Sequence, residues 1–359
     1  MSGIFGAIGV SDSDRVFKAT AGQRVIYEAA ARFVAERNAE LDAAYAVFVQ
    51  GETEDYKLRY KLPGGGYLQR RGRAGRPGAV KATGQWDVAF PLEDFADAIA
   101  IDDVTMAYMT VGELDRHLQT VVARNINTVR FEMIKALVNN TADTFVDELW
   151  GSLTIQPLCN TDGTLYPPVL GSNTEADDEH YIISGYTSAN ISDANNPFPT
   201  LRAELEEHFG APTGGANVAV FINQGQTTKC RALSNFVELP ATAIQVGANT
   251  AVPQAVPPEL MRFGQVLGWC DGCWVIEWRW ITAEFALAIH LDAEKPLMKR
   301  VDPADTGLGR GLQLVTRETE FPFEESFWRH RFGYGCANRL NGVVMEFDTV
   351  GYTIPTGYS

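Results

Sequence analysis

The chain has 359 residues, of which 45% are hydrophobic and 21% charged, with 33 glycines and five cysteines. This usage is close to that of an average globular protein, so it excludes collagen-like, coiled-coil-only and wholly disordered chains. The net charge of −15 argues against a protein that binds nucleic acid with its whole surface, because a phosphate polymer would be repelled at long range.

The length predicts about two domains at ~150 residues per domain. No stretch approaches the ~20 uninterrupted apolar residues of a spanning helix, so we expect no membrane partner. Residues 1–10 contain no basic residue ahead of their apolar run and do not resemble a signal peptide, so we expect folding in the cytoplasm. The five cysteines are odd in number and scattered, and we interpret them as reduced thiols.

The N-terminal part reads as an arm followed by a helix. Residues 1–19 are small and polar with little periodicity, so they offer no face with which to join a core. Thr20 and Gln23 match a capping box, and apolar residues then recur at helical spacing. The pattern predicts a helix from Thr20 to near Gly51.

A basic, glycine-rich hairpin is predicted over residues 52–88. Tyr56, Leu58 and Tyr60 alternate with basic residues, which is the period of a strand. Residues 52–81 contain eight basic and three acidic side chains, a local charge of +5 in an acidic chain. Such a hairpin is marginally stable alone, so we expect it to lie against another surface. The basic side chains predicted to contact a neighbouring subunit are Lys57, Arg59, Lys61, Arg70, Arg71, Arg73 and Arg76.

The longest helix is predicted at about 110–139. Thr110 and Glu113 form a second capping box, and one apolar face then continues until Asn139. At 1.5 Å per residue this helix spans roughly 45 Å, a length that suits a strut. Its charged face, which includes Arg124 and Arg130, is interpreted as solvated, with packing against another subunit as the alternative.

The second half predicts short strands around a helix. Strands are expected at 144–149, 152–158, 218–222, 265–267, 274–281, 285–291 and 342–347, and a helix at 199–209. The prolines Pro167 and Pro168 and the acidic run 175–179 suggest a boundary between two domains. The order of elements indicates an α+β protein.

No catalytic, cofactor or metal site is predicted. Cys270 and Cys273 have the spacing of a zinc or redox pair, but no second cysteine pair exists and a strand follows, so a tight turn between strands is favoured. The histidines form no H-x-x-x-H pair, and His208 beside three glutamates is interpreted as the end of a solvated acidic helix. The Cys270–Cys273 pair is the one feature that keeps an enzyme among the alternatives.

Four motifs in this order resemble one protein family along essentially the whole chain. They are Pro91-Leu-Glu-Asp-Phe, Val111-Gly-Glu-Leu-Asp-Arg-His-Leu, Gly151-Ser-Leu-Thr-Ile with Asp162-Gly-Thr-Leu-Tyr-Pro, and Phe332-Gly-Tyr-Gly-Cys-Ala-Asn-Arg-Leu-Asn. The chain resembles the major capsid protein of tailed bacteriophages, with the Hong Kong 97-like fold. None of the motifs is catalytic, so the specificity of the resemblance comes from their order.

The resemblance implies a division of the chain. Residues 1–50 would form the N-terminal arm and helix, 51–90 the extended loop, 91–165 with 325–359 the peripheral domain containing the spine helix, and 166–324 the axial domain.

The resemblance also implies a function and partners. It implies a shell subunit, not an enzyme, that forms hexamers and pentamers of an icosahedral virion around double-stranded DNA, after assembly in the host cytoplasm. Portal, separate scaffold and decoration proteins are the further partners that it implies, with no cofactor. An encapsulin-like compartment, which encloses proteins, is the alternative.

Overall fold

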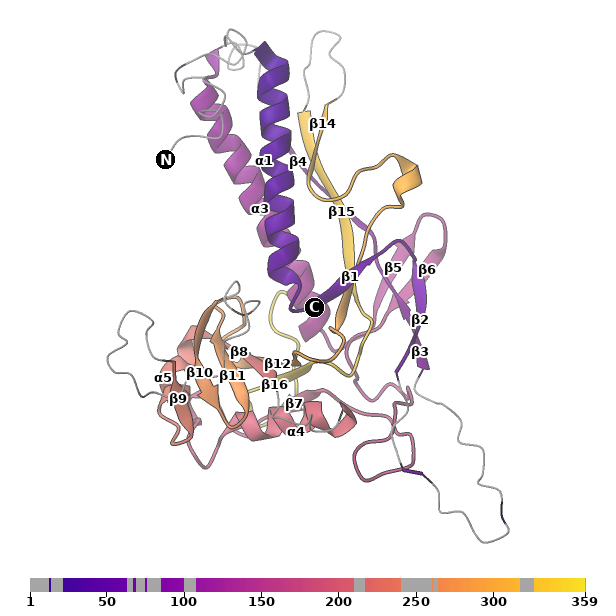
Figure 1. Cartoon of the computed structure of the whole chain (residues 1–359), viewed down its shortest axis with the longest axis vertical. Coiled ribbons are helices and arrows are strands. Elements are labelled where there is room, and N and C mark those ends of the chain that lie inside the picture. Colours follow the sequence, from indigo (N-terminus) through magenta and orange to yellow (C-terminus); the bar gives the residue numbers. More distant parts are fainter. Residues whose placement is uncertain are drawn as a thin grey trace.

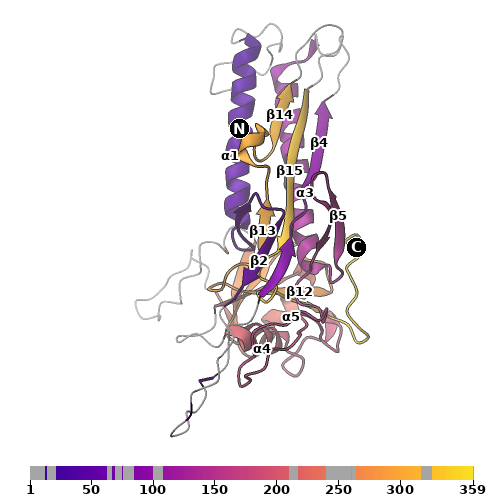
Figure 2. The ribbon, with the colours of Figure 1, turned by 90° about the vertical axis from the view of Figure 1, so that its right-hand side faces the viewer.

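The computed structural model describes most of the chain. The described residues are 13, 22–62, 67, 68, 75, 85–99, 108–209, 217–239, 260, 264–316 and 326–358. They form an elongated molecule in which one sheet runs along the long axis and a second sheet lies at one end (Figures 1 and 2). None of the described helices has the length and hydropathy needed to cross a membrane.

The long sheet has five strands gathered around one central strand. The 11-residue strand β15 (Ser326–Cys336) pairs with β13, β14 and β4, and β1 extends the sheet by pairing in parallel with β13. The bounds are β1 Val49–Thr53, β4 Glu93–Ile99, β13 Leu297–Arg300 and β14 Gln313–Thr316. Two helices, α1 (Gly22–Tyr45) and α3 (Val111–Val138), lie along one side of β15 (Figure 1).

Helix α3 follows its sequence closely. The Thr110 hydroxyl accepts from the Glu113 amide and the Glu113 carboxylate accepts from the Thr110 amide, so both halves of the predicted capping box form. The predicted apolar face is buried, including Leu118, Val129 and Met133. The predicted spine helix is therefore confirmed with bounds within one residue.

Helix α1 differs from its prediction at both ends. The proposed cap residue Thr20 lies outside the described residues. The helix ends at Tyr45 instead of continuing to Gly51, because Phe48 enters the core against the rings of Phe221 and Trp278, at 4.9 and 5.4 Å. Residues 49–53 then form β1, a strand that the sequence pattern did not predict.

The second sheet has seven strands in the order β7-β16-β12-β8-β11-β10-β9. Their bounds are β7 Tyr181–Ile183, β8 Val218–Ile222, β9 Phe236–Glu238, β10 Gln265–Cys270, β11 Cys273–Glu277, β12 Phe285–His290 and β16 Val343–Glu346. The predicted strands at 218–222, 265–267, 274–281, 285–291 and 342–347 are confirmed, with small shifts of their ends.

Both faces of this sheet are buried. On the central strand β8, Val218, Val220 and Ile222 point to one core and Ala219 and Phe221 to the other, as the period of two requires. Helix α4 (Pro197–Phe209) covers the first face with three buried side chains, Phe198, Leu201 and Leu205.

The C-terminal half of α3 joins the two sheets. Val129, Met133 and Leu137 belong to the same buried cluster as Phe221 from the seven-stranded sheet and Phe332 from β15. The helix therefore fixes the orientation of one sheet relative to the other through a continuous apolar core.

Two hairpins lie beside the long sheet (Figure 1). One pairs β2 (Lys57–Lys61) with β3 (Gln85–Ala89), and the other pairs β5 (Asp143–Asp147) with β6 (Gly151–Ile155). Both were predicted. The remaining short helices are η3 Ser188–Asn190, η4 Gln224–Gln226, α5 Thr227–Arg231 and η6 Ala304–Thr306.

The chain passes between the two sheets more often than the division at residues 166 and 324 implies. Strands β13 and β14 precede residue 325 but belong to the long sheet, and β16 follows it but belongs to the seven-stranded sheet. Sheet membership therefore alternates along the sequence.

Candidate functional site

The base of the predicted loop is the β2–β3 hairpin. Lys57 and Arg59 both reach the carboxylate of Asp87 on the opposite strand, at 3.1 and 2.9 Å. Hydrogen bonds from Arg59 and Lys57 lower the pKa of Asp87. Two of the predicted contact residues therefore share one intramolecular anion, which leaves the pair of cations only half neutralised.

The other predicted contact residues differ in what the structure describes. Lys61 is exposed at the end of β2. The four loop arginines, Arg70, Arg71, Arg73 and Arg76, lie outside the described residues.

A stack of aromatic rings fastens the hairpin to the body of the protein. Tyr60 packs on Trp86 and Trp86 packs on Tyr166, with ring centroids 5.3 and 5.2 Å apart. The Trp86 indole N–H also donates to the carbonyl of Ala337 at 3.0 Å. The position of the hairpin therefore depends on the segment around Tyr166 and on the chain that follows β15.

Arg339 holds that segment. Its side chain is 1% exposed, its guanidinium lies 5.7 Å from the Tyr166 ring, and it donates 2.8 Å to the Asp162 carboxylate. Its other acceptors are Pro157 O at 2.7 Å, Leu158 O at 3.1 Å, Asn160 Oδ1 at 3.1 Å and Thr164 Oγ1 at 3.2 Å. Two of the motifs singled out in the sequence, Asp162–Pro167 and Phe332–Asn341, thus meet through one buried arginine.

The end of the β5–β6 hairpin displays apolar side chains. Val146, Leu149 and Trp150, here called the β5–β6 tip, are 72, 85 and 55% exposed. The Trp150 ring stacks at 4.3 Å on Tyr56, just before β2. The tip therefore lies next to the base of the basic hairpin.

A buried ion pair fixes the shape of this tip. The Asp147 carboxylate accepts from the amides of Leu149 and Trp150, at 2.9 and 3.1 Å, and pairs with Arg300 at 2.8 Å. Arg300 also donates to Phe90 O at 2.9 Å, so the turn is tied to β13 and to the end of β3. The sequence prediction missed the tip, although the Leu149-Trp150 pair between two short strands was its visible signal.

Cys270 and Cys273 lie at the two ends of the β10–β11 turn, as predicted. They face each other across the ladder, and Asp271 and Gly272 between them have positive φ angles of 47° and 90°. Burial raises the pKa of both thiols, to about 12 for Cys270. A thiol that stays protonated is a poor nucleophile and a poor metal ligand, so the pair has the properties of a structural turn.

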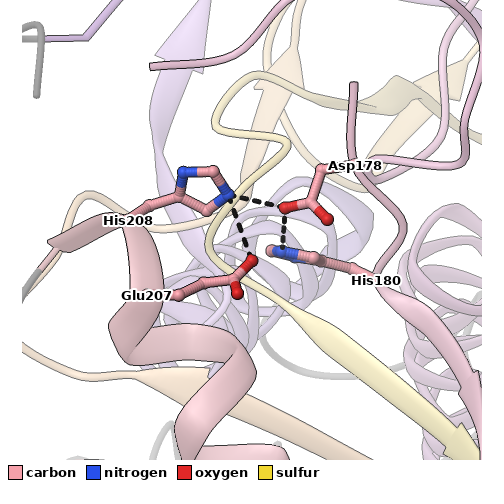
Figure 3. A group of neighbouring side chains, drawn as sticks. All are labelled: Asp178, His180, Glu207 and His208. Carbon is pink, nitrogen blue, oxygen red and sulfur yellow. Dashed lines mark hydrogen bonds and ion pairs between the residues drawn. The ribbon is translucent and has the colours of Figure 1, made fainter. Parts of the chain in front are cut away.

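A second cluster was missed by the sequence reasoning. Asp178 and His180 precede β7, and Glu207 and His208 end α4, yet their polar atoms lie within 4.8 Å of one another (Figure 3). The prediction that His208 ends a solvated helix is wrong, because its side chain is 3% exposed. Burial and Asp178 raise the pKa of Glu207 to about 7. We call these four residues the histidine–carboxylate cluster.

Comparison with solved structures places the fold. The chain matches a chain of Mycobacterium phage Patience with a TM-score of 0.66 and 16% identity, over 94% of this chain and 93% of that one. Weaker matches include the capsid of a native GTA particle (TM-score 0.47, 12% identity, 85% and 90% covered) and the capsid of Myoviridae phage XM1 (0.44, 10%, 85% and 91%). No protein-family model matches the sequence, and no curated protein matches it either. The predicted α+β, Hong Kong 97-like architecture is confirmed by the first match, which spans nearly the whole of both chains.

Proposed function

We propose that this chain, which has the Hong Kong 97-like fold, is a major capsid protein that assembles into hexamers and pentamers of an icosahedral shell. The observation that carries the proposal is the shared fold along 94% of the chain. Inference from fold to function is an analogy, so it needs support from surfaces of this chain that only assembly would explain.

The β5–β6 tip provides the first support. Three large apolar side chains on one turn are costly to leave in water, and a buried ion pair holds them outward. Such a turn is typical of a contact that a neighbouring subunit covers. A standard interface buries ~800 Å² on each partner, and the tip would contribute its apolar centre.

The basic hairpin provides the second support. We propose that Lys57, Arg59 and Lys61, with Arg70, Arg71, Arg73 and Arg76 of the loop, contact acidic surface of an adjacent subunit. Asp87 offsets only one of the charges at the base, and the rest of the chain is strongly acidic. Complementary charge would fix the register between subunits more than it would add affinity.

Several finer points belong to the same proposal. We propose double-stranded DNA as the non-specifically enclosed content, a portal, a scaffold and decoration proteins as partners, and the virion, after assembly in the host cytoplasm, as the location. The role is structural and not catalytic, which agrees with the protonated state that burial favours for Cys270 and Cys273.

Substitutions in the tip test the proposal. Leu149→Ser with Trp150→Ser should leave the subunit folded, because both side chains are exposed, yet reduce particle formation at least ~10-fold in electron micrographs. Glu148→Gln, in the same turn, removes no apolar surface and should assemble like the wild type. Assembly of the double variant at the wild-type level would remove the tip from the proposed interface.

Charge reversal tests the loop. Arg70→Glu with Arg71→Glu and Arg73→Glu should weaken assembly while the circular dichroism spectrum stays that of a folded subunit. Unchanged assembly would refute an ionic contact between subunits, and empty shells that fail only when filled would assign the loop to DNA instead.

A further inference from the structure

The histidine–carboxylate cluster is built from two distant parts of the chain. Asp178 and His180 approach from the segment before β7, and Glu207 and His208 from the last turn of α4, so that all four polar ends converge (Figure 3). His180 Nε2 lies 3.5 Å from Asp178 Oδ2, and His208 Nε2 lies 2.6 Å from the same oxygen and 3.5 Å from Glu207 Oε1. His180 is fully buried.

The outer nitrogens of both imidazoles are occupied in the same way. His180 Nδ1 is 2.8 Å from Gly342 O, and His208 Nδ1 is 3.1 Å from Pro167 O. A carbonyl oxygen only accepts, so each Nδ1 donates its proton, and in a neutral ring Nε2 then carries the lone pair. A carbonyl held by the far nitrogen is the arrangement that orients histidine ligands toward a metal ion.

The inward-facing atoms do not satisfy one another. His180 Nε2 is buried and has no hydrogen-bond partner. Asp178 Oδ1 already accepts from the Glu179 amide at 2.8 Å, so it is Oδ2 that faces both rings. Two nitrogen lone pairs and carboxylate oxygens, all acceptors, therefore point at one another, and a buried acceptor without a donor is unfavourable.

We propose that the histidine–carboxylate cluster is a structural binding site for one divalent transition-metal ion, with Zn²⁺ as the best fit. His180 Nε2, His208 Nε2, Asp178 Oδ2 and Glu207 Oε1 would be the ligands. Two imidazoles and two carboxylates suit Zn²⁺ more than Mg²⁺ or Ca²⁺, which prefer oxygen ligands. Four protein ligands close the coordination sphere, so the role is structural.

The distances fit a tetrahedral ion with one local change. Ligands at about 2.1 Å from Zn²⁺ lie roughly 3.4 Å apart in a tetrahedron. The His180–Asp178 and His208–Glu207 separations of 3.5 Å already match, while the 2.6 Å between His208 and Asp178 must widen. The side chains of Asp178 and Glu207 are 20 and 31% exposed, so they have room to adjust.

Bound metal would fasten helix α4 to the segment that leads into β7. The surrounding backbone is already fixed, because the His180 amide donates to Cys159 O, Val344 N donates to His180 O and Leu170 N donates to Glu207 O. The site would therefore connect α4, the 157–170 segment and β16 at one point. This inference does not depend on the proposed capsid function.

Metal content of the purified full-length chain tests the proposal. Protein expressed with zinc and dialysed against metal-free buffer should hold about one zinc per chain by inductively coupled plasma mass spectrometry. Chelation should lower the melting temperature by ~2–4 °C, and ZnCl₂ should restore it. Cobalt added to the chelated protein should give the intense visible bands of tetrahedral Co²⁺.

Matched histidine variants localise the ion. His208→Gln and Glu207→Gln should lose at least ~10-fold in zinc content, whereas His117→Gln, at an exposed histidine on α3, should keep it. If His208→Gln does not fold, the rim variant Glu207→Gln and the wild-type titration still decide. A wild type without zinc and without a shift in melting temperature on ZnCl₂ addition would overturn the proposal, as would equal zinc in the wild type and both cluster variants.

Discussion

Replacing Arg339 should unfasten the segment that supports the loop hairpin. In Arg339→Met the side-chain volume is roughly kept, but five hydrogen bonds of a 1%-exposed guanidinium are lost. The carbonyls of Pro157 and Leu158 are buried, and each unpaired acceptor costs about 1–3 kcal/mol. The Asp162 carboxylate is 23% exposed, so water partly offsets its loss.

Together these contributions predict a loss of about 3–5 kcal/mol in the free energy of unfolding, the usual cost of removing one partner from a buried charged network. Arg339→Lys keeps the charge but not the planar fork, and should lose about 2–3 kcal/mol. Arg279→Met, at an exposed arginine, should change stability by less than about 0.5 kcal/mol.

Urea denaturation of the unassembled subunit, followed by tryptophan fluorescence, measures these differences. The signal is suitable because Trp86 packs on Tyr166 in the supported segment. An Arg339→Met protein within about 1 kcal/mol of the wild type would refute the view that this arginine carries the segment.

The pH dependence of the same network has a definite sign. Burial opposes ionisation of Asp162, but hydrogen bonds from Thr164 and Arg339 outweigh it, so the pKa of Asp162 is lowered. Its contribution is therefore present above its unfolded value near pH 4 and is lost as the pH falls below that value. The acid side of the stability curve should flatten in Asp162→Asn.

Three further predictions follow from other parts of the molecule. Val129→Asp places a charge in the core between the two sheets and should abolish soluble folded subunit on expression, whereas Arg124→Ala, which breaks an exposed pair with Asp97, should express normally; equal yields would mean that α3 is buried on a different face. Burial, with Lys299 nearby, lowers the pKa of His330 to about 3, so the unfolded chain gains a proton below pH ~6.5 that the folded chain refuses, and stability should fall by about 2 kcal/mol between pH 7 and 5. His330→Gln should remove that slope, and parallel curves for variant and wild type would contradict it. Particles held by the basic loop should loosen in molar salt by light scattering, because ionic contacts are screened, and unchanged particles would assign the contact to apolar side chains instead.

Local signals explain why some elements were predictable. The α3 cap uses residues three apart, its apolar face repeats over the whole helix, and the Cys270–Cys273 turn spans four residues. Each depends on neighbours in the sequence, so the pattern predicts the structure directly.

Long-range pairing explains what was missed. Strand β15 contains Gly333 and Gly335, which read as breaks in a strand pattern. In the structure they admit close backbone approach, since a Cβ on Gly333 would lie 2.2 Å from Pro91 O. Strand β1 was missed because its partner β13 is more than 240 residues away in the sequence.

The same reason applies to the sites. The histidine–carboxylate cluster joins residues about 30 positions apart, and no spacing rule reveals which acidic residue meets which histidine. The predicted basic contact residues followed from charge alone, so their identity was visible while the intramolecular partner Asp87 was not.

Cryo-electron microscopy of the purified full-length chain, after concentration in assembly buffer, tests the central claim most directly. The account predicts closed icosahedral shells of hexamers and pentamers, with the β5–β6 tip of each subunit covered by a neighbour. Shells that enclose protein instead of DNA when isolated from infected or expressing cells would favour the encapsulin-like alternative. A compact monomer at concentrations well above micromolar, with no particles on the grid, would contradict the account.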